Sequence, residues 1–347
     1  MAPELEHNNI HSPIRNIGFI STRIAGTDGV SLEIQKWAEV LTRLGYRCYY
    51  FAGELDRPDE VSFNVKEAHF DHPEVEAITK EVFGRRIRRR ETTRKINELK
   101  DLLKTRLYDF LIKHSIDLII PENCLAIPMN IPLALAITEL VAETGKPTIA
   151  HHHDFSWERN RFLVNACQDY LNMAFPPDLP SIHHVVINSL AAEQLSHRRG
   201  ISNVIIPNVL DFANEPPKPD EYEHDLRKMA GLEEDDPFIL QPTRVVPRKW
   251  IERSIEIVNG LKLKNPKLII SHSSGDEGDD YYIRIKQYAR NHNVEIVHID
   301  HMMSAKRTTD SQGNKLFTIR DVYQCADLVT YPSGYEGFGN AFLEAIY

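Results

Sequence analysis

The sequence predicts an α/β protein of two doubly wound domains, each built on a parallel sheet that is covered by helices. The chain has 347 residues, about twice the usual length of one domain. Short apolar runs alternate with amphipathic segments almost from end to end, which is typical of parallel strands joined by helices. The alternation breaks at Asp211–Asp225, a proline-rich acidic segment, and then restarts. We therefore expect two domains connected by a linker.

The first domain is predicted over residues 1–210. Its first unit is the clearest, because Val30, Ile34, Ala38 and Leu41 follow a helical spacing of three and four residues. Gly45 is expected to end that helix. The expected elements are strand Ile17–Ser21, loop Thr22–Gly29, helix Val30–Leu44, strand Tyr46–Phe51, a helical region over Glu74–His114, strand Asp117–Pro121, helix Ile131–Thr144, strand Pro147–His151, segment Trp157–Asn172, strand His184–Asn188, a helix from Ser189 and strand Asn203–Pro207.

The linker is predicted over residues 211–235 and the second domain over 236–347. A last helix begins near Asn340 and is cut short at Tyr347, so we expect the second domain to be incomplete. Two such domains would bind a ligand between them, outside the carboxyl ends of their strands. The expected elements are strand Phe238–Gln241, helix Ile251–Leu263, strand Lys267–Ser271, helix Tyr281–Asn291, strand Val294–His298, helix Ile319–Cys325 and strand Asp327–Tyr331.

Composition and charge exclude several classes of partner. The net charge of −9 argues against nucleic acid, which needs a basic face. The one strong basic run, Gly84–Lys95, lies in a polar helical stretch and is interpreted as a solvated face, so membrane contact is not expected. The four cysteines have no paired spacing, and Met1–Arg15 has no apolar core typical of a signal peptide. These features predict a cytoplasmic protein, and they do not indicate its oligomeric state.

The segment Tyr331–Ala345, "YPSGYEGFGNAFLEA", carries the strongest signal for chemistry. A predicted strand ends in a glycine-rich loop, and a helix follows at Asn340. Glycines let the backbone approach a ligand, and the N–H groups of a first helical turn bind anions. Glu336 and Glu344 add carboxylates, which accept hydrogen bonds from hydroxyl groups. The combination favours a ligand with both phosphates and sugar hydroxyls.

The Glu-x7-Glu pattern in "EGFGNAFLEA", with the preceding "DVYQCADLVTYPS", resembles the signature of retaining glycosyltransferases of the GT-B fold, most closely glycosyltransferase family four. The resemblance implies two Rossmann-like domains with the donor site in the second. It also implies that Glu336 contacts the donor hexose and Glu344 the nucleotide ribose. The donor site would further include the backbone of Gly337, Phe338, Gly339 and Asn340.

A second donor-binding loop is predicted at Gln241–Trp250, "QPTRVVPRKW". Arg244 and Lys249 can converge on one pyrophosphate, because arginine binds as a fork and lysine as a point charge. The family resemblance extends to this Arg-x4-Lys pair, which would hold the donor diphosphate. Thr243 and Trp250 depart from it, since glycines are common at both flanks.

Two segments of the first domain are weaker candidates. The loop "AGTDGVS" lacks a complete G-x-G-x-x-G motif. In the resembled family, a loop at this place lies against the donor phosphates and the acceptor. We assign that role to Gly26, Thr27, Asp28 and Gly29, with a purely structural turn as the equal alternative. The run "AHHHDF" ends a predicted strand. Neighbouring residues of a strand point to opposite faces, so no metal site is expected. The resemblance implies a histidine facing the sugar, and His153 and Asp154 are the candidates, with His152 as an alternative.

The sequence therefore predicts a retaining hexosyltransferase that uses a UDP- or GDP-linked sugar and a hydroxyl acceptor, with neither metal nor cofactor. Arg244 and Lys249 would stabilise the charge that grows on the departing diphosphate. The second half is also similar to transferases that make small glycosides such as glycosylated glycerates. The alternatives are a non-catalytic sugar-nucleotide-binding homologue and a nucleotide-sugar epimerase. A nicotinamide-dependent dehydrogenase lacks its glycine fingerprint.

Overall fold

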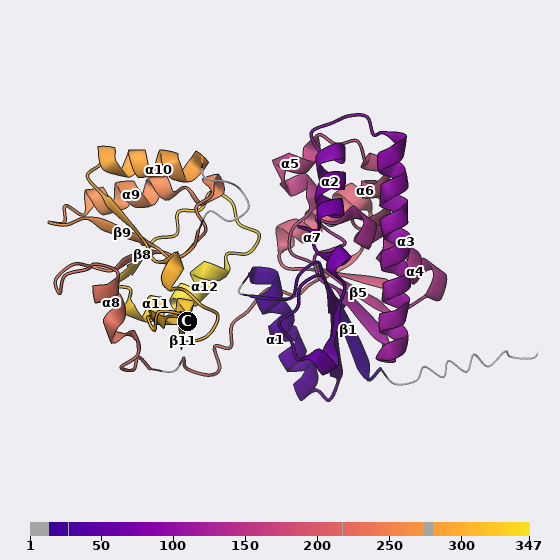
Figure 1. Cartoon of the computed structure of the whole chain (residues 1–347), viewed down its shortest axis with the longest axis horizontal. Helices are drawn as coiled ribbons and strands as arrows, with labels where there is room; N and C mark the ends of the chain where they lie inside the picture. Colours follow the sequence, from indigo (N-terminus) through magenta and orange to yellow (C-terminus); the bar gives the residue numbers. More distant parts are fainter. Residues whose placement is uncertain (1–13, 27, 217, 274–279) are drawn as a thin grey trace, which may run out of the picture. The chain divides into compact units, whose positions relative to one another are not determined.

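The structure is a computed structural model that describes residues 14–26, 28–216, 218–273 and 280–347. The chain divides into two compact units, Met1–Pro207 and Asn208–Tyr347. Each unit is an α/β fold with a parallel sheet (Figure 1).

Unit 1 contains a parallel sheet of seven strands in the order β3-β2-β1-β4-β5-β6-β7. The order of the strands reverses between β1 and β4, which is where open α/β sheets bind ligands, outside the carboxyl ends of the strands. The strands are β1 Asn16–Ile20, β2 Arg47–Ala52, β3 Ser62–Asn64, β4 Leu118–Pro121, β5 Thr148–His152, β6 Ile182–Val186 and β7 Asn203–Ile205.

Helices cover both faces of this sheet. On one face, Phe19 of β1 and Ile120 of β4 pack with Ile34 and Ala38 of α1. The other face packs against α2, α3, α4 and α6, and α3 lies along α4 (Figure 1). The helix α4 is apolar all round because it is buried on nearly every side. The helices are α1 Gly29–Arg43, α2 Pro73–Val82, α3 Arg90–Lys113, α4 Ile131–Thr144, α5 Asn160–Leu163, α6 Gln168–Ala174 and α7 Ser189–Arg199.

Unit 2 contains a parallel sheet of four strands in the order β10-β9-β8-β13, with the reversal between β8 and β13. Helices α9 and α10 pack on one face and α8 and α11 on the other (Figure 1). The elements are α8 Leu226–Met229, β8 Ile239–Gln241, α9 Ile251–Gly260, β9 Lys267–Ile270, α10 Asp280–Asn291, β10 Glu295–His298, the antiparallel pair β11 Thr308–Thr309 and β12 Lys315–Leu316, α11 Ile319–Cys325, β13 Leu328–Val329 and α12 Asn340–Ile346.

The fold class is as predicted, and several local expectations were wrong. The helical region expected over Glu74–His114 is two helices, separated by residues 83–89. The segment Trp157–Asn172 holds the short helix α5 and most of α6, and β6 begins two residues before the expected start. Part of the expected linker folds into unit 2, because α8 places Leu226 in a core cluster with residues of α11.

Candidate functional site

The first group of candidate residues lies at the strand reversal of unit 1. Glu122 follows β4 directly, and its backbone carbonyl accepts a hydrogen bond from Ser21, which follows β1, at 3.1 Å. An isolated parallel bridge joins Glu122 to His151 near the end of β5. The carboxyl ends of β1, β4 and β5 therefore bring Glu122 and the histidine run together, as expected for neighbouring parallel strands.

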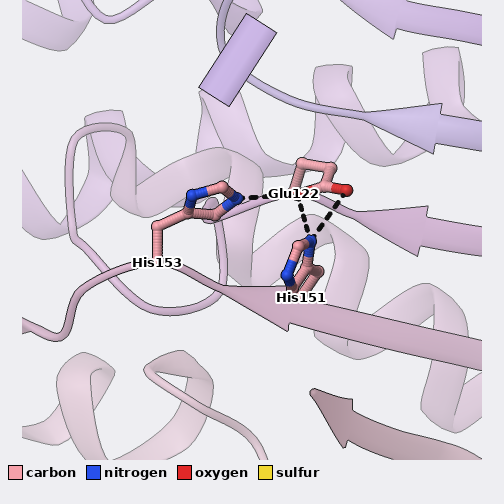
Figure 2. A group of neighbouring side chains, drawn as sticks. All are labelled: Glu122, His151 and His153. Carbon is pink, nitrogen blue, oxygen red and sulfur yellow. Dashed lines mark hydrogen bonds and ion pairs between the residues drawn. The ribbon is translucent and has the colours of Figure 1, made fainter. Parts of the chain in front are cut away.

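Two of the three histidines contact the buried Glu122 carboxylate (Figure 2). Nδ1 of His151 lies 3.0 Å from Oε2, and Nε2 of His153 lies 3.2 Å from the same oxygen. Side chains alternate along the chain, so residues 151 and 153 share a face while His152 points the other way. Burial alone would raise the pKa of Glu122, but the two imidazoles outweigh it and lower that pKa to about 2. Burial would lower the pKa of His153, and the Glu122 carboxylate raises it above its usual value.

His152 is paired away from this group. Its Nε2 lies 2.9 Å from Nδ1 of His184, and both side chains are buried. Burial lowers the pKa of His152 well below its usual value and that of His184 to about 4. The pair is therefore neutral at neutral pH, and its place is in the packing between β5 and β6.

Asp154, the other candidate of this segment, is held by two neighbours. Its Oδ1 accepts from Nδ2 of Asn123 at 2.9 Å, and its Oδ2 accepts from Nε of Arg159 at 2.7 Å. The side chain of Asn123 also accepts from the backbone N–H of His153 at 3.0 Å. Asn123 and Arg159 thus fix the turn that follows β5.

Asp28, at the end of the N-terminal loop, is the N-cap of α1. Its carboxylate caps α1 by accepting from the backbone N–H of Val30 at 3.1 Å and that of Ser31 at 3.2 Å, and Arg23 lies 3.2 Å away. Gly26 adopts a φ of 74° and donates to Asp56 at 2.8 Å. Gly29 is the first residue of α1, and Thr27 lies outside the described residues. These contacts give Asp28 a structural role, and contact of the loop with a donor stays a prediction.

The second group lies at the strand reversal of unit 2, where the segments after β8 and β13 meet. The turn Pro247–Lys249 follows β8 and places two cations on one carboxylate. Nζ of Lys249 bonds to Oε1 of Glu336, and Nη1 of Arg248 lies 3.1 Å from Oε2. The backbone N–H of Gly334 donates to the carbonyl of Arg248 at 3.0 Å and holds the two loops together. The structure therefore brings Lys249 and Glu336 into contact, and their binding of a donor stays a prediction.

The charge of this site is governed by burial and by neighbouring groups. Lys249 is 8% exposed, and burial lowers its pKa while Glu336 acts in the opposite direction. Burial would raise the pKa of Glu336, but its hydrogen bond with Lys249, with other contacts, keeps that pKa below its usual value. Burial lowers the pKa of His272 to about 4, and the positive charges of Arg244 and Lys249 add to this effect. Arg244 thus belongs to the same cationic region, with Arg248 as an addition that the sequence pattern did not single out.

The glycine-rich loop is shaped by close contacts. A side chain at Gly334 would collide with the indole of Trp250, since a Cβ there would lie 2.4 Å from the ring. Trp250 itself has a φ of 47°, a left-handed conformation in which glycine is favoured. Gly339 has a φ of 96° and lies beside Tyr331. Position 250 therefore has a left-handed backbone of the kind that glycine favours, although it carries a tryptophan.

The remaining predicted donor residues follow Glu336. Gly337 and Phe338 are half-buried in the loop, and Oδ1 of Asn340, the first residue of α12, accepts from Asn208 at 3.2 Å. Glu344 lies on α12, where its Oε2 is 3.1 Å from the hydroxyl of Tyr323. Burial and this carboxylate raise the pKa of Tyr323, so the phenol stays a donor. The two glutamates therefore have different neighbours, which is compatible with two different roles.

Within the described part of the chain, one group of side chains has donor atoms close enough together to hold a metal ion. The donor atoms of Glu122, His151 and His153 lie within 4.8 Å of one another. A metal-bound histidine normally donates its other N–H to an acceptor, but Nε2 of His151 is buried among the described residues without a partner. The cluster fits a hydrogen-bonded network better than a metal centre, and the absence of a bound metal stays a prediction.

Comparison with curated proteins gives two relatives over nearly the whole chain. The mannosylglucosylglycerate synthase of Thermotoga maritima is 33% identical over 95% of this chain and 78% of that protein. The protein of the same name from Petrotoga mobilis is 31% identical over 95% of this chain and 80% of its own length. The chain belongs to the GT-B glycosyltransferases of the family-four type.

Solved structures agree with the fold of this glycosyltransferase. A glycosyltransferase from Rickettsia africae superposes with a TM-score of 0.60 at 15% identity, covering 96% of this chain and 76% of that one. Sucrose-phosphate synthase of Thermosynechococcus elongatus gives a TM-score of 0.59 at 17% identity, over 96% and 79% of the two chains. No family model matches the sequence. Among the described helices, none has the length and apolar character needed to cross a membrane.

Proposed function

We propose that this glycosyltransferase moves a hexose from a UDP- or GDP-linked donor to a hydroxyl group of a small glyceric acid glycoside. The assignment is carried by one observation, the convergence of Lys249 and Arg248 on Glu336 at the strand reversal of unit 2. Cations at this edge suit a diphosphate, and a carboxylate beside them suits the hydroxyls of a sugar. The names of the two relatives support a hexosyl donor and a glycerate-bearing product, with mannose as the first hexose to test.

In the proposed reaction, the bond between the anomeric carbon and the diphosphate oxygen breaks as the acceptor oxygen bonds to that carbon. Lys249, Arg248 and Arg244 stabilise the negative charge that develops on the leaving diphosphate, because they are already in place when the charge appears. The acceptor proton passes to a phosphate oxygen of the leaving group. Glu336 orients the hexose, and Glu344 holds the ribose.

Retention of configuration and independence from metal are part of this proposal. Both are what the resemblance of Glu336 and Glu344 to the family-four pattern implies, and the fixed cations Lys249, Arg248 and Arg244 can stabilise a leaving diphosphate without a metal. In unit 1, His153 would contact the hexose and Asp154 would keep the following turn in place through Arg159.

The test is a transfer assay with purified chain, a panel of UDP- and GDP-linked hexoses, and glucosylglycerate as acceptor. We expect nucleotide diphosphate and a new glycoside in equal amounts, and the one-bond coupling between C1 and H1 of the transferred hexose should match that of an α-linked donor. A product of opposite configuration would refute retention alone. Binding of donor without any transfer would favour the non-catalytic homologue.

A further inference from the structure

The contacts of Glu122 assign the hydrogen atoms of the histidine cluster. An ionised carboxylate is an acceptor only, so each imidazole nitrogen that faces it must carry a proton. Nδ1 of His151 and Nε2 of His153 both face Oε2, at 3.0 and 3.2 Å. These two nitrogens are therefore N–H donors, whatever the charge of each ring.

The charge of the cluster follows from its burial. Glu122 and His151 are fully buried, and the side chain of His153 is 10% exposed. A buried carboxylate with two neutral imidazoles leaves one uncompensated negative charge, and two imidazolium rings leave one positive charge. One imidazolium gives zero net charge, which costs least away from water.

The extra proton belongs on His153. If His151 carried it, Nε2 of that ring would be a charged donor, and this atom is buried among the described residues with no hydrogen-bond partner. The partly exposed ring of His153 can bring its second N–H to water or to a ligand.

The surrounding charges agree with this assignment. Asp154 follows on the same segment and is paired with Arg159, and Glu33 of α1 is paired with Lys36 at 3.2 Å. Both carboxylates act with Glu122 to raise the pKa of His153. The neighbouring His152 is neutral at neutral pH, because burial lowers its pKa well below the usual value.

We propose that Glu122 is a positioning residue that holds His153 as an imidazolium at the carboxyl ends of β4 and β5, with its second N–H, at Nδ1, available to a ligand. This inference rests on the proposed function in one respect: the ligand that receives the hydrogen bond is taken to be a substrate of the transfer reaction. Glu122 does not bind that ligand itself, and it acts through the charge and orientation of His153.

A pH dependence follows, with a defined sign. The imidazolium is present below the pKa of His153 and is lost as pH rises through it. Transfer should therefore fall on the alkaline side of that pKa. Without the Glu122 charge the pKa of His153 would fall, and the same decrease in transfer would begin at lower pH.

The first test uses the unaltered chain and needs no activity. In 15N NMR spectra of the full chain at pH 6.5, we expect both ring nitrogens of His153 to be protonated and His151 to be neutral with its proton on Nδ1. A neutral His153, or a proton on Nε2 of His151, would overturn the proposal. Calorimetric titration with Zn²⁺ covers the metal alternative: tight stoichiometric binding that His151→Ala abolishes would also overturn it.

The second test compares Glu122→Gln with Glu33→Gln, which also removes the charge of a buried glutamate that acts on His153. We expect Glu122→Gln to lower the titration midpoint of His153 by about one pH unit or more. At pH values above the midpoint of the unaltered chain, kcat of the variant should be about tenfold lower than that of the unaltered chain. Glu33→Gln should shift both far less. Equal midpoints in Glu122→Gln and the unaltered chain would overturn the proposal. If His153 shifts as expected in a chain that transfers no sugar, the proposed function fails and the positioning role stands.

Discussion

Replacing Lys249 with methionine tests the cationic site of unit 2 most directly. Methionine keeps the length and apolar character of the side chain and removes the ammonium group that bonds to Glu336. Lys249 is 8% exposed, and its ammonium lies 5.7 Å from the ring centre of Tyr331. The change therefore removes one charge from a largely buried position and disturbs the packing little.

Two magnitudes follow from these contacts. Loss of a charged hydrogen bond to a diphosphate should weaken binding of a bare nucleotide diphosphate by about 1.5–3 kcal/mol, or about 10- to 150-fold in Kd. Glu336 keeps Arg248 at 3.1 Å, so its charge is not left uncompensated. The loss of folding free energy should then lie between the values for exposed and buried pairs, at about 1–2 kcal/mol.

The assay is calorimetric titration with UDP and GDP, and urea unfolding shows that the variant is folded. Lys264→Met is the matched control, because Lys264 is an exposed lysine of the same unit. We expect its affinity to equal that of the unaltered chain. If folded Lys249→Met bound both nucleotides as tightly as Lys264→Met, Lys249 would have no role at the diphosphate and the reasoning from Glu336 would be wrong.

Three further predictions concern other parts of the molecule. Glu336→Gln should impair transfer and leave the affinity for bare nucleotide diphosphate unchanged. Glu344→Gln should weaken binding of the bare nucleotide and of the full donor alike, by about 1–2 kcal/mol, as competition binding would show. Equal effects of the two variants on the bare nucleotide would refute the separate roles. The His152–His184 pair is neutral in the folded chain, and both pKa values are lowered. The free energy of unfolding should therefore be highest above pH 6.5 and should decrease toward pH 4, because the unfolded chain takes up protons first. The decrease is about 3 kcal/mol for His184 alone. Urea midpoints between pH 7.5 and 4.5 check this, and His184→Gln should flatten the slope. Turnover should survive EDTA, and a loss restored by manganese would refute metal independence.

The elements of the fold were largely predictable because long periodic segments specify helices and strands by themselves. Helix α1 is within one residue of the predicted Val30–Leu44, since its apolar stripe and the Asp28 cap are both local signals. Strand β3 and the pair β11–β12 were missed, because they are two or three residues long and, unlike the equally short β7, β8 and β13, are not part of a marked apolar run. The gap between α2 and α3 was missed because the polar stretch around it has a weak apolar pattern.

The site was only partly predictable, for a different reason. Glu336 and Lys249 belong to motifs with fixed spacing, so the sequence names them before any contact is known. Glu122 belongs to no motif, and its partners His151 and His153 are about thirty residues away on another strand. Only the order of the strands, which places β4 beside β5, shows that the residue after one strand meets the histidines of the next. Arg248 was overlooked for a similar reason, since its role depends on the turn that aims it at Glu336.

The contacts of Glu336 explain why a site suited to an anion also contains a carboxylate. Burial lowers the pKa of Lys249, and an isolated buried lysine would tend to lose the proton that a diphosphate needs. Glu336 opposes this effect through its bond to the ammonium, so the cation is kept charged in a largely buried position. On our proposal the donor phosphates take over that task when they bind, because they offer negative charge to the same cations. The carboxylate can then turn to the hydroxyls of the hexose, and one residue would serve both to keep the site charged and to read the sugar.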